Sequence, residues 1–249
     1  MAKIGLQIYS IRDIYSKNAA EAFKLIKDSG YEAVDMFGGI PMEAAELKKM
    51  LDDVGLECCG WHMGLDFAKT PEDLDKFAEY NKVIGNKYLI VPGLPGEYMQ
   101  NKDTWLKAAE KLNEIAAQLK KHGMYTGLHS HAAEFAKLEG TDDYPWDIIA
   151  KNTCEDVVLQ LDMGNTLHAG VEPLEILKRY KGRYQTIHMK PFSKAKGFGT
   201  IIGEDDIDWA EAVNYCKAHG NTEYFIVEYE EADAAAEIKA CCTNLKKYL

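Results

Sequence analysis

Carboxylate and imidazole side chains recur along the chain, each directly after a short apolar run. The positions are Asp35, His62, His129 with His131 and Glu134, Asp162, His188 with Lys190, and Glu228 with Glu230. Four of the seven histidines belong to this set. Such side chains bind divalent cations through nitrogen and oxygen atoms and exchange protons near neutral pH. If the fold brings them together, the expected chemistry is metal-assisted acid–base catalysis.

Eight strands and eight helices alternate in the pattern of apolar residues. Strands are predicted at residues 4–9, 33–36, 57–62, 88–91, 125–129, 157–161, 184–188 and 225–228. Helices are predicted at residues 19–29, 41–54, from Thr70-Pro71 onward, and at 103–122, 145–152, 173–180, 208–219 and 232–248. The helix boundaries rest on capping signals, such as Thr70 before Pro71 and Gly55 after an amphipathic run.

Regular alternation of strands and helices requires parallel strands, because each helix returns the chain to the edge where the strand began. A doubly wound sheet is less suitable, since the first turn, Tyr9-Ser10-Ile11-Arg12-Asp13, has no glycine for a dinucleotide phosphate. Eight units in 249 residues favour a closed (β/α)₈ barrel. No linker interrupts the sequence, so residues 1–249 are interpreted as one domain.

Composition excludes several classes of function. Hydrophobic residues make up 47% and charged residues 28%, which is typical of a globular protein with a packed core. The 29 basic against 40 acidic residues give a net charge of −11, which argues against a nucleic-acid partner. No apolar run approaches the roughly 20 residues that span a bilayer. The start, Met1-Ala2-Lys3-Ile4, carries no cleavable leader, so a cytoplasmic location is expected.

In a (β/α)₈ barrel the ends of all strands meet at one mouth, so the polar residues would converge there. Each residue taken singly could be structural, but carboxylates gathered at one point need a neutralising cation. Without a thiolate, the ligand types fit manganese, cobalt, magnesium or zinc equally well. His122 and His219 each precede a glycine at a helix end and are interpreted as structural. His168 could contact substrate or simply lie in a loop.

Five segments carry a resemblance to a known family. They are residues 5–13 (GLQIYSIRD), 128–135 (LHSHAAEF), 161–165 (LDMGN), 187–190 (IHMK) and 226–228 (IVE). Together they resemble, nearly end to end, the sugar phosphate isomerase/epimerase family of xylose isomerase-like barrels. That superfamily also contains dehydratases, lyases and DNA-repair endonucleases. The family's fold is the barrel already expected from the alternation.

The resemblance implies one divalent metal ion and a set of site residues. The implied metal ligands are Glu134, Asp162, His188 and Glu228, and the implied substrate contacts are His62, His131, Asn165, His168 and Lys190. The chain departs from the family at two positions. Ketose epimerases have a glutamate where strand 5 ends at His129, so His129 and Glu134 are both candidate ligands. Pro191 replaces the aspartate that often follows the His-x-Lys motif.

The expected reaction is sugar isomerisation or epimerisation by proton transfer next to a carbonyl, through an enediolate. Glu228 is the first choice as base, with His129 or Glu134 opposite, and Lys190 or His62 would stabilise the developing oxyanion. No glycine-rich or arginine-rich phosphate site is evident, so a neutral sugar, polyol or glycoside is favoured.

Three alternatives remain open at this stage. A lyase, either a dehydratase of a keto-inositol or a cleaver of 3-keto-glycosides, would begin with the same proton abstraction. A DNA-repair endonuclease is disfavoured by the net charge of −11. A non-catalytic sugar-binding barrel would bind no metal. A homo-oligomer is plausible.

Overall fold

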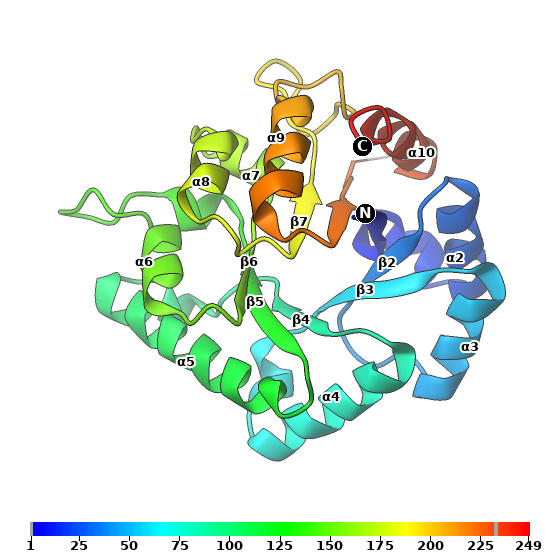
Figure 1. Ribbon diagram of the computed structural model, residues 1–249, viewed down its shortest axis with the longest axis horizontal. Helices are drawn as coiled ribbons and strands as arrows, with labels where there is room; N and C mark the ends of the chain where they lie inside the picture. Colours follow the sequence, from blue (N-terminus) through cyan, green and yellow to red (C-terminus); the bar gives the residue numbers. More distant parts are fainter. Residues whose placement is uncertain (1, 232–233) are drawn as a thin grey trace.

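Eight parallel strands form a barrel with helices around the outside (Figure 1). The computed structural model describes residues 2–231 and 234–249. The strands are β1 (Lys3–Gln7), β2 (Ala33–Phe37), β3 (Glu57–His62), β4 (Tyr88–Val91), β5 (Tyr125–His129), β6 (Val157–Gln160), β7 (Thr186–Met189) and β8 (Tyr224–Val227). The predicted (β/α)₈ fold is therefore confirmed.

The strands follow the order β6-β5-β4-β3-β2-β1-β8-β7, and the barrel closes between β6 and β7. The closure is made just beyond β6, where Asp162 forms a parallel bridge with His188. The His188 amide donates a hydrogen bond of 2.9 Å to the carbonyl of Leu161. Two of the predicted site residues thus lie side by side at the seam of the barrel.

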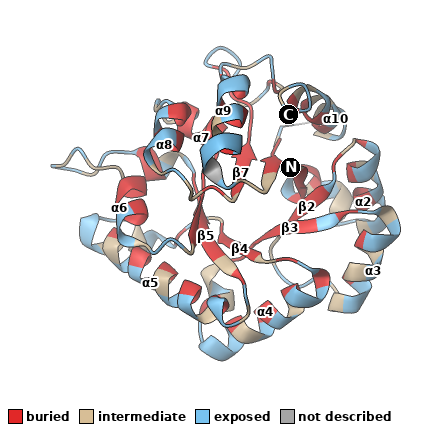
Figure 2. Ribbon diagram, viewed as in Figure 1, coloured by how far each residue is buried: buried red, intermediate tan, exposed pale blue. Residues whose placement is uncertain are grey.

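The outer layer follows the predicted helices closely. Its helices are α2 (Ala19–Asp28), α3 (Ala44–Val54), α4 (Pro71–Ile84), α5 (Lys102–Lys120), α6 (Pro145–Asn152), α8 (Pro173–Arg179), α9 (Trp209–Tyr215) and α10 (Ala234–Leu245). Each buries the face that packs on the barrel and exposes the other (Figure 2). Thr70 caps α4 by accepting from the Asp73 amide, and Gly55 ends α3 at a φ of 71°.

Several boundaries differ from the sequence-based expectations, and two short helices were not predicted. Strand β1 ends at Gln7, because the Gln7 side chain accepts the Tyr9 amide and turns the chain into a 3-10 turn and α1 (Arg12–Tyr15). The helix predicted at 41–54 starts at Ala44, and α9 gives way to a π-helical turn at Cys216–Gly220. A further short helix, α7 (Met163–His168), was not predicted. The predicted helix 232–248 begins at residues 232 and 233, which lie outside the described part of the chain.

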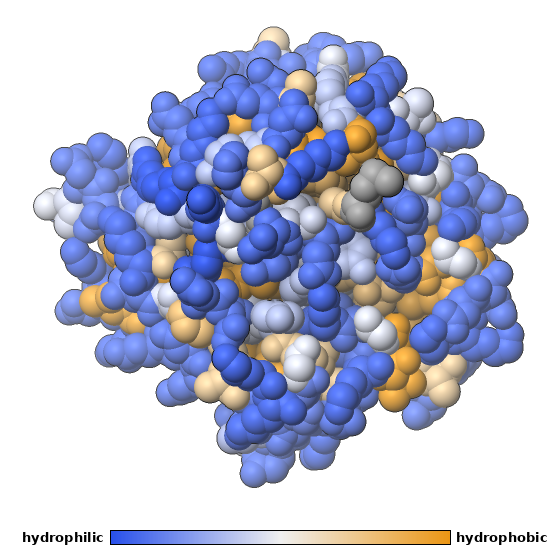
Figure 3. All heavy atoms as spheres, viewed as in Figure 1, coloured by the Kyte–Doolittle hydropathy of each residue, from blue (hydrophilic) through white to orange (hydrophobic). Residues whose placement is uncertain are grey.

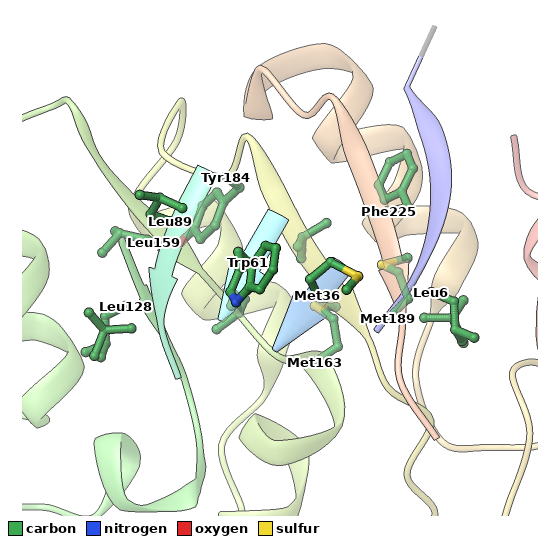
Figure 4. Packing of buried hydrophobic residues seen from close by; sticks show 14 of the residues in the cluster. Leu6, Met36, Trp61, Leu89, Leu128, Leu159, Met163, Tyr184, Met189 and Phe225 are labelled. Atoms are coloured by element: carbon green, nitrogen blue, oxygen red, sulfur yellow. The ribbon is translucent and has the colours of Figure 1, made fainter. Parts of the chain in front are cut away.

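Most of the core lies between the barrel and the helices. Strand residues such as Leu6, Met36 and Trp61 point into this layer (Figure 4). The barrel interior holds two smaller apolar clusters, Ala33 with Cys59 and Ile226, and Tyr88 with Ile90 and Val158. Hydrophilic side chains predominate on the face in Figure 3, with apolar ones in small patches. No helix in the described residues has the length and apolarity needed to span a bilayer.

Candidate functional site

The inward-facing residues at the ends of the strands form a polar layer near the mouth, and three of them, Asp35, Gln160 and Glu228, lie two positions after Ala33, Val158 and Ile226 of the interior apolar clusters. Because side chains alternate across a strand, residues two apart face the same side. The layer consists of Gln7, Asp35, His62, His129, Gln160, His188 and Glu228, and all of them are buried. Burying so many polar groups is costly unless they are paired or hold a ligand, so this layer is the candidate functional site.

Four side chains in and beside this layer offer ligand atoms to a common point. His129, Asp162, His188 and Glu228 each contribute one atom, and these atoms lie within 4.8 Å of one another. Asp162 Oδ1 accepts the Asn165 amide at 2.7 Å, but Oδ2 is buried with no hydrogen-bond partner among the described residues. An orphaned carboxylate oxygen facing three other donors fits a divalent cation.

His188 is held at both ring nitrogens. Its Nδ1 lies 2.6 Å from Glu228 Oε2, and its Nε2 lies 3.2 Å from Asp35 Oδ2. Burial alone would lower the pKa of His188, but the hydrogen bonds to Asp35 and Glu228 raise it to about 9. A charged imidazole therefore occupies the centre of the cluster when no metal is bound.

Gln160 orients two further histidines. Its Oε1 lies 2.7 Å from His62 Nε2 and 3.1 Å from His129 Nδ1, while its Nε2 donates to Thr186 at 2.9 Å. This amide orientation places a proton on His129 Nδ1. Burial lowers the pKa of His129 well below its usual value, so the ring is neutral. Its Nε2 then presents a lone pair 3.9 Å from Asp162 Oδ2.

Glu228 also contacts two cationic groups. Lys190 Nζ lies 3.0 Å from Glu228 Oε1 and bonds to Glu230 as well. Burial raises the pKa of Glu228, but Lys190 and His188 outweigh it and hold the pKa well below the ordinary range. The Asp162 carboxyl behaves differently, because burial raises its pKa to about 7 despite the pull of Lys190. Lys190 and His188 thus hold Glu228 in its ionised form.

Glu134, a predicted ligand, has a local structural partner instead. It lies in the 3-10 turn Ala132–Phe135 after β5, and its Oε2 accepts the His131 amide at 2.7 Å. Burial raises the pKa of Glu134 to about 7. Among the described residues, the strand-5 member of the four-donor group is His129 rather than Glu134.

A cavity of about 390 Å³ opens above the polar layer. Its lining residues are Gln7, Tyr9, Phe37, Gly38, His62, Gly64, Pro92, His129, His131, Glu228 and Glu230. The predicted substrate contacts His62 and His131 are therefore at the cavity. In the described part of the chain the lining includes neither Asn165 nor His168. Asn165 holds Asp162 from the start of α7, and His168 packs on Phe192 and Phe198 with ring centroids 5.1 and 5.2 Å away.

The sequence analysis missed Gln7 and Gln160, whose side chains form hydrogen bonds with Asp35 and with His62 and His129. One signal was present, because each is a polar residue inside an otherwise apolar strand. In this register such a residue points into the barrel and must find partners there. Asp35 was among the strand-end residues, but its partner could not be read from the sequence.

Comparisons with known proteins agree with this architecture. The family described as "Xylose isomerase-like TIM barrel" matches residues 23–247. An inosose dehydratase of Clostridium perfringens is 25% identical, covering 89% of this chain and 85% of that protein. A sugar phosphate isomerase/epimerase from Parabacteroides distasonis has a TM-score of 0.85 at 22% identity, over 99% of this chain and 98% of that one. An L-ribulose 3-epimerase has a TM-score of 0.72 at 15% identity, over 100% and 96% of the two chains.

Proposed function

The chain belongs to the xylose isomerase-like TIM barrel family, and from that premise we propose a metal-dependent enzyme that removes a proton beside the carbonyl of a neutral keto sugar or keto-polyol. The observation that carries the proposal is the convergence of His129, Asp162, His188 and Glu228 within 4.8 Å. The orphaned Oδ2 of Asp162 marks where a cation would be held. The cavity directly above is the space for the substrate.

His129, rather than the predicted Glu134, is our proposed strand-5 ligand, beside Asp162, His188 and Glu228. Support comes from the His129 ring, which is neutral and has its Nδ1 occupied by Gln160. A bound divalent cation, with manganese, cobalt, magnesium and zinc as candidates, would polarise the substrate carbonyl and acidify the neighbouring C–H bond.

The protein groups around the cavity supply the proton transfer. Glu228 lines the cavity and is kept ionised by Lys190 and His188, so its carboxylate can accept the proton from carbon. His62 and His131 line the same cavity and are placed to return a proton. Lys190 carries a positive charge beside Glu228, just behind the cavity lining, and its field would favour negative charge on the enediolate oxygen without a direct contact.

The cavity favours an uncharged substrate. Among the described residues, its lining contains no lysine or arginine. Lys190, just behind it, is already paired with Glu228 and Glu230. A phosphate group would therefore meet carboxylates without a free cationic partner, which is unfavourable.

The same first step leads to two products. Return of the proton to the other carbon or the other face gives isomerisation or epimerisation, which is our leading proposal. If instead the electron pair released from the C–H bond forms a double bond and the β-hydroxyl leaves, protonated, as water, the result is dehydration. The inosose dehydratase relative, matched over 89% of this chain, supports dehydration as the second candidate.

Proton exchange tests the shared step directly. The metal-loaded enzyme is incubated in heavy water with neutral ketoses, inososes and 3-keto-glycosides, and deuterium at carbon is followed by NMR. We expect incorporation with at least one substrate, and its loss in Asp162→Asn and His188→Ala. His122→Gln, far from the mouth, is the matched control and should keep the exchange.

Product analysis separates the two reactions. A new epimer or isomer identifies an isomerase, whereas an absorbing conjugated enone identifies a dehydratase. Wild-type protein that binds none of the four metals, even after reconstitution, would contradict the proposal as a whole.

A further inference from the structure

We propose that Asp35 is a positioning residue, which fixes the proton on His188 Nε2 and so reserves His188 Nδ1 for the metal. This inference rests on the proposed function, because it concerns the same metal site. Asp35 is fully buried on β2, across the barrel from β7. It does not belong to either group of clustered donor atoms found among the described residues.

The contacts of Asp35 all converge on one oxygen. Oδ2 lies 3.2 Å from His188 Nε2 and 3.5 Å from His62 Nε2, and it accepts a hydrogen bond from Gln7 Nε2 at 3.0 Å. The other oxygen, Oδ1, is buried and has no hydrogen-bond partner among the described residues. A buried carboxylate with an unsatisfied oxygen costs free energy, which favours a compensating role for this side chain.

The backbone around Asp35 is adapted to its carboxylate. The pairing of β2 with β3 shifts register between Val34 and Asp35, so that Asp35 pairs with Gly60 and Cys59 is skipped. Such bulges re-aim side chains next to active sites. A Cβ added at Gly60 would lie 2.5 Å from Asp35 Oδ1, so only glycine leaves room for the carboxylate.

The bulge, Gly60 and Gln7 thus hold the Asp35 carboxylate at hydrogen-bond distance from His188 Nε2, with His62 Nε2 slightly farther away. A carboxylate behind a metal-binding histidine fixes which nitrogen carries the proton and holds the ring in place. Both ring nitrogens contact a carboxylate, but Glu228 is a member of the donor group and lines the cavity, whereas Asp35 does neither, so the cation would take the nitrogen on the Glu228 side, Nδ1.

Metal affinity is the first test. The dissociation constant for Mn²⁺ is measured by calorimetry for wild type, Asp35→Asn and the control Asp147→Asn. Asp147 is also buried but pairs with Arg179 on the outer layer. Losing such a carboxylate typically weakens metal binding about 10- to 100-fold, and we expect that for Asp35→Asn with Asp147→Asn unchanged.

The outcomes are distinguishable from failure of the proposed function. Wild type that binds no metal overturns the proposed function itself. Wild type that binds Mn²⁺, with an Asp35→Asn variant of equal affinity, overturns this inference alone. Complete loss of binding in Asp35→Asn, equal to that of Asp162→Asn, also overturns it, because Asp35 would then be a ligand.

A second measurement does not depend on the Asp35 variant folding. Long-range ¹H–¹⁵N correlations of the zinc-loaded wild type report which nitrogen of His188 carries the proton. We expect the proton on Nε2 and the metal on Nδ1. A metal-bound Nε2 would overturn the inference. Gln7→Leu, which removes the second donor to Asp35, should weaken Mn²⁺ binding by a smaller factor than Asp35→Asn, and an unchanged affinity would count against the inference.

Discussion

Two histidines of this protein have nearly the same local geometry in different surroundings. His188, at the mouth, has Glu228 2.6 Å from Nδ1 and Asp35 3.2 Å from Nε2. His122, after α5 on the outer layer, has Glu79 3.0 Å from Nδ1 and Asp75 2.7 Å from Nε2. The His188 ring and Asp35 are 0% exposed, whereas Asp75 and Glu79 are 40% and 59% exposed.

The difference shows that burial, rather than hydrogen-bond distance, separates a candidate metal site from a surface ion pair. Around His122, water solvates the carboxylates and screens their charge. The His188 and Asp35 side chains are fully buried, so solvent screens their charges less and each acts more strongly on its neighbours and on a cation held there. The sequence-based interpretation of His122 as structural agrees with its position between two outer helices.

Removing each histidine in turn should give the largest difference in Mn²⁺ affinity between the two clusters. We expect His188→Ala to weaken Mn²⁺ binding by more than about 100-fold, because a ligand and the centre of the cluster are lost. His122→Ala should change the dissociation constant by less than about twofold, since it lies outside the cluster. Calorimetric titration of both variants checks this, and equal effects would break the comparison.

The second largest effect is expected on stability, when a methyl group is added beside Asp35 in the buried cluster. Gly60→Ala places a Cβ against Asp35 Oδ1 and is expected to destabilise the fold by about 1–3 kcal/mol. In an Asp35→Ala background the added methyl group finds space, so the cost should shrink. Gly39→Ala, which would meet nothing within 4 Å, is the matched control. Urea unfolding is measured for wild type, the three single variants and the double variant, and a Gly60→Ala cost independent of Asp35 would refute the coupling.

The two glutamines that serve the two histidine clusters offer a finer test. Gln160 holds His129 at the mouth, and Gln118 donates to Asp75 at 2.6 Å on the outer layer. Gln160→Leu should weaken Mn²⁺ binding about tenfold, because His129 loses the partner that fixes its tautomer. Gln118→Leu should leave Mn²⁺ binding unchanged. A normal affinity in Gln160→Leu would exclude the proposed role of His129 as ligand.

The smallest effect is expected for the pH dependence of stability at the surface cluster of His122, Asp75 and Glu79. The hydrogen bond from His122 lowers the pKa of Asp75, and Lys82 followed by His122 lowers the pKa of Glu79. A carboxyl with a lowered folded-state pKa stabilises the protein above its ordinary pKa, and that contribution disappears as the pH falls through the folded-state value.

His122→Gln should therefore lower Tm by at most about 2 °C at pH 6 and low salt. The difference should shrink toward pH 3 and at high salt. A Tm difference that grows toward low pH would contradict the expected loss of the carboxylates' stabilising contribution on acidification.

Some residues of the candidate site could be predicted because each is a carboxylate or histidine at the end of a predicted strand. Asp162, His188 and Glu228 follow apolar runs, and the structure brings them together. The sequence could not separate the candidate ligands His129 and Glu134, because it does not show that the turn Ala132–Phe135 folds Glu134 back onto the His131 amide. Nothing in the spacing of LHSHAAEF distinguishes a side chain that faces the mouth from one that caps its own turn.

The sequence by itself determined the barrel and the place of the site, because strand and helix periodicities are local and strand ends meet at one mouth in this fold. Only the tertiary structure decided how the cluster is connected. Asp35 reaches His188 across 153 positions of sequence, and the register shift beside Gly60 aims it there. Such pairings depend on barrel closure and strand register, which no local pattern of residues encodes.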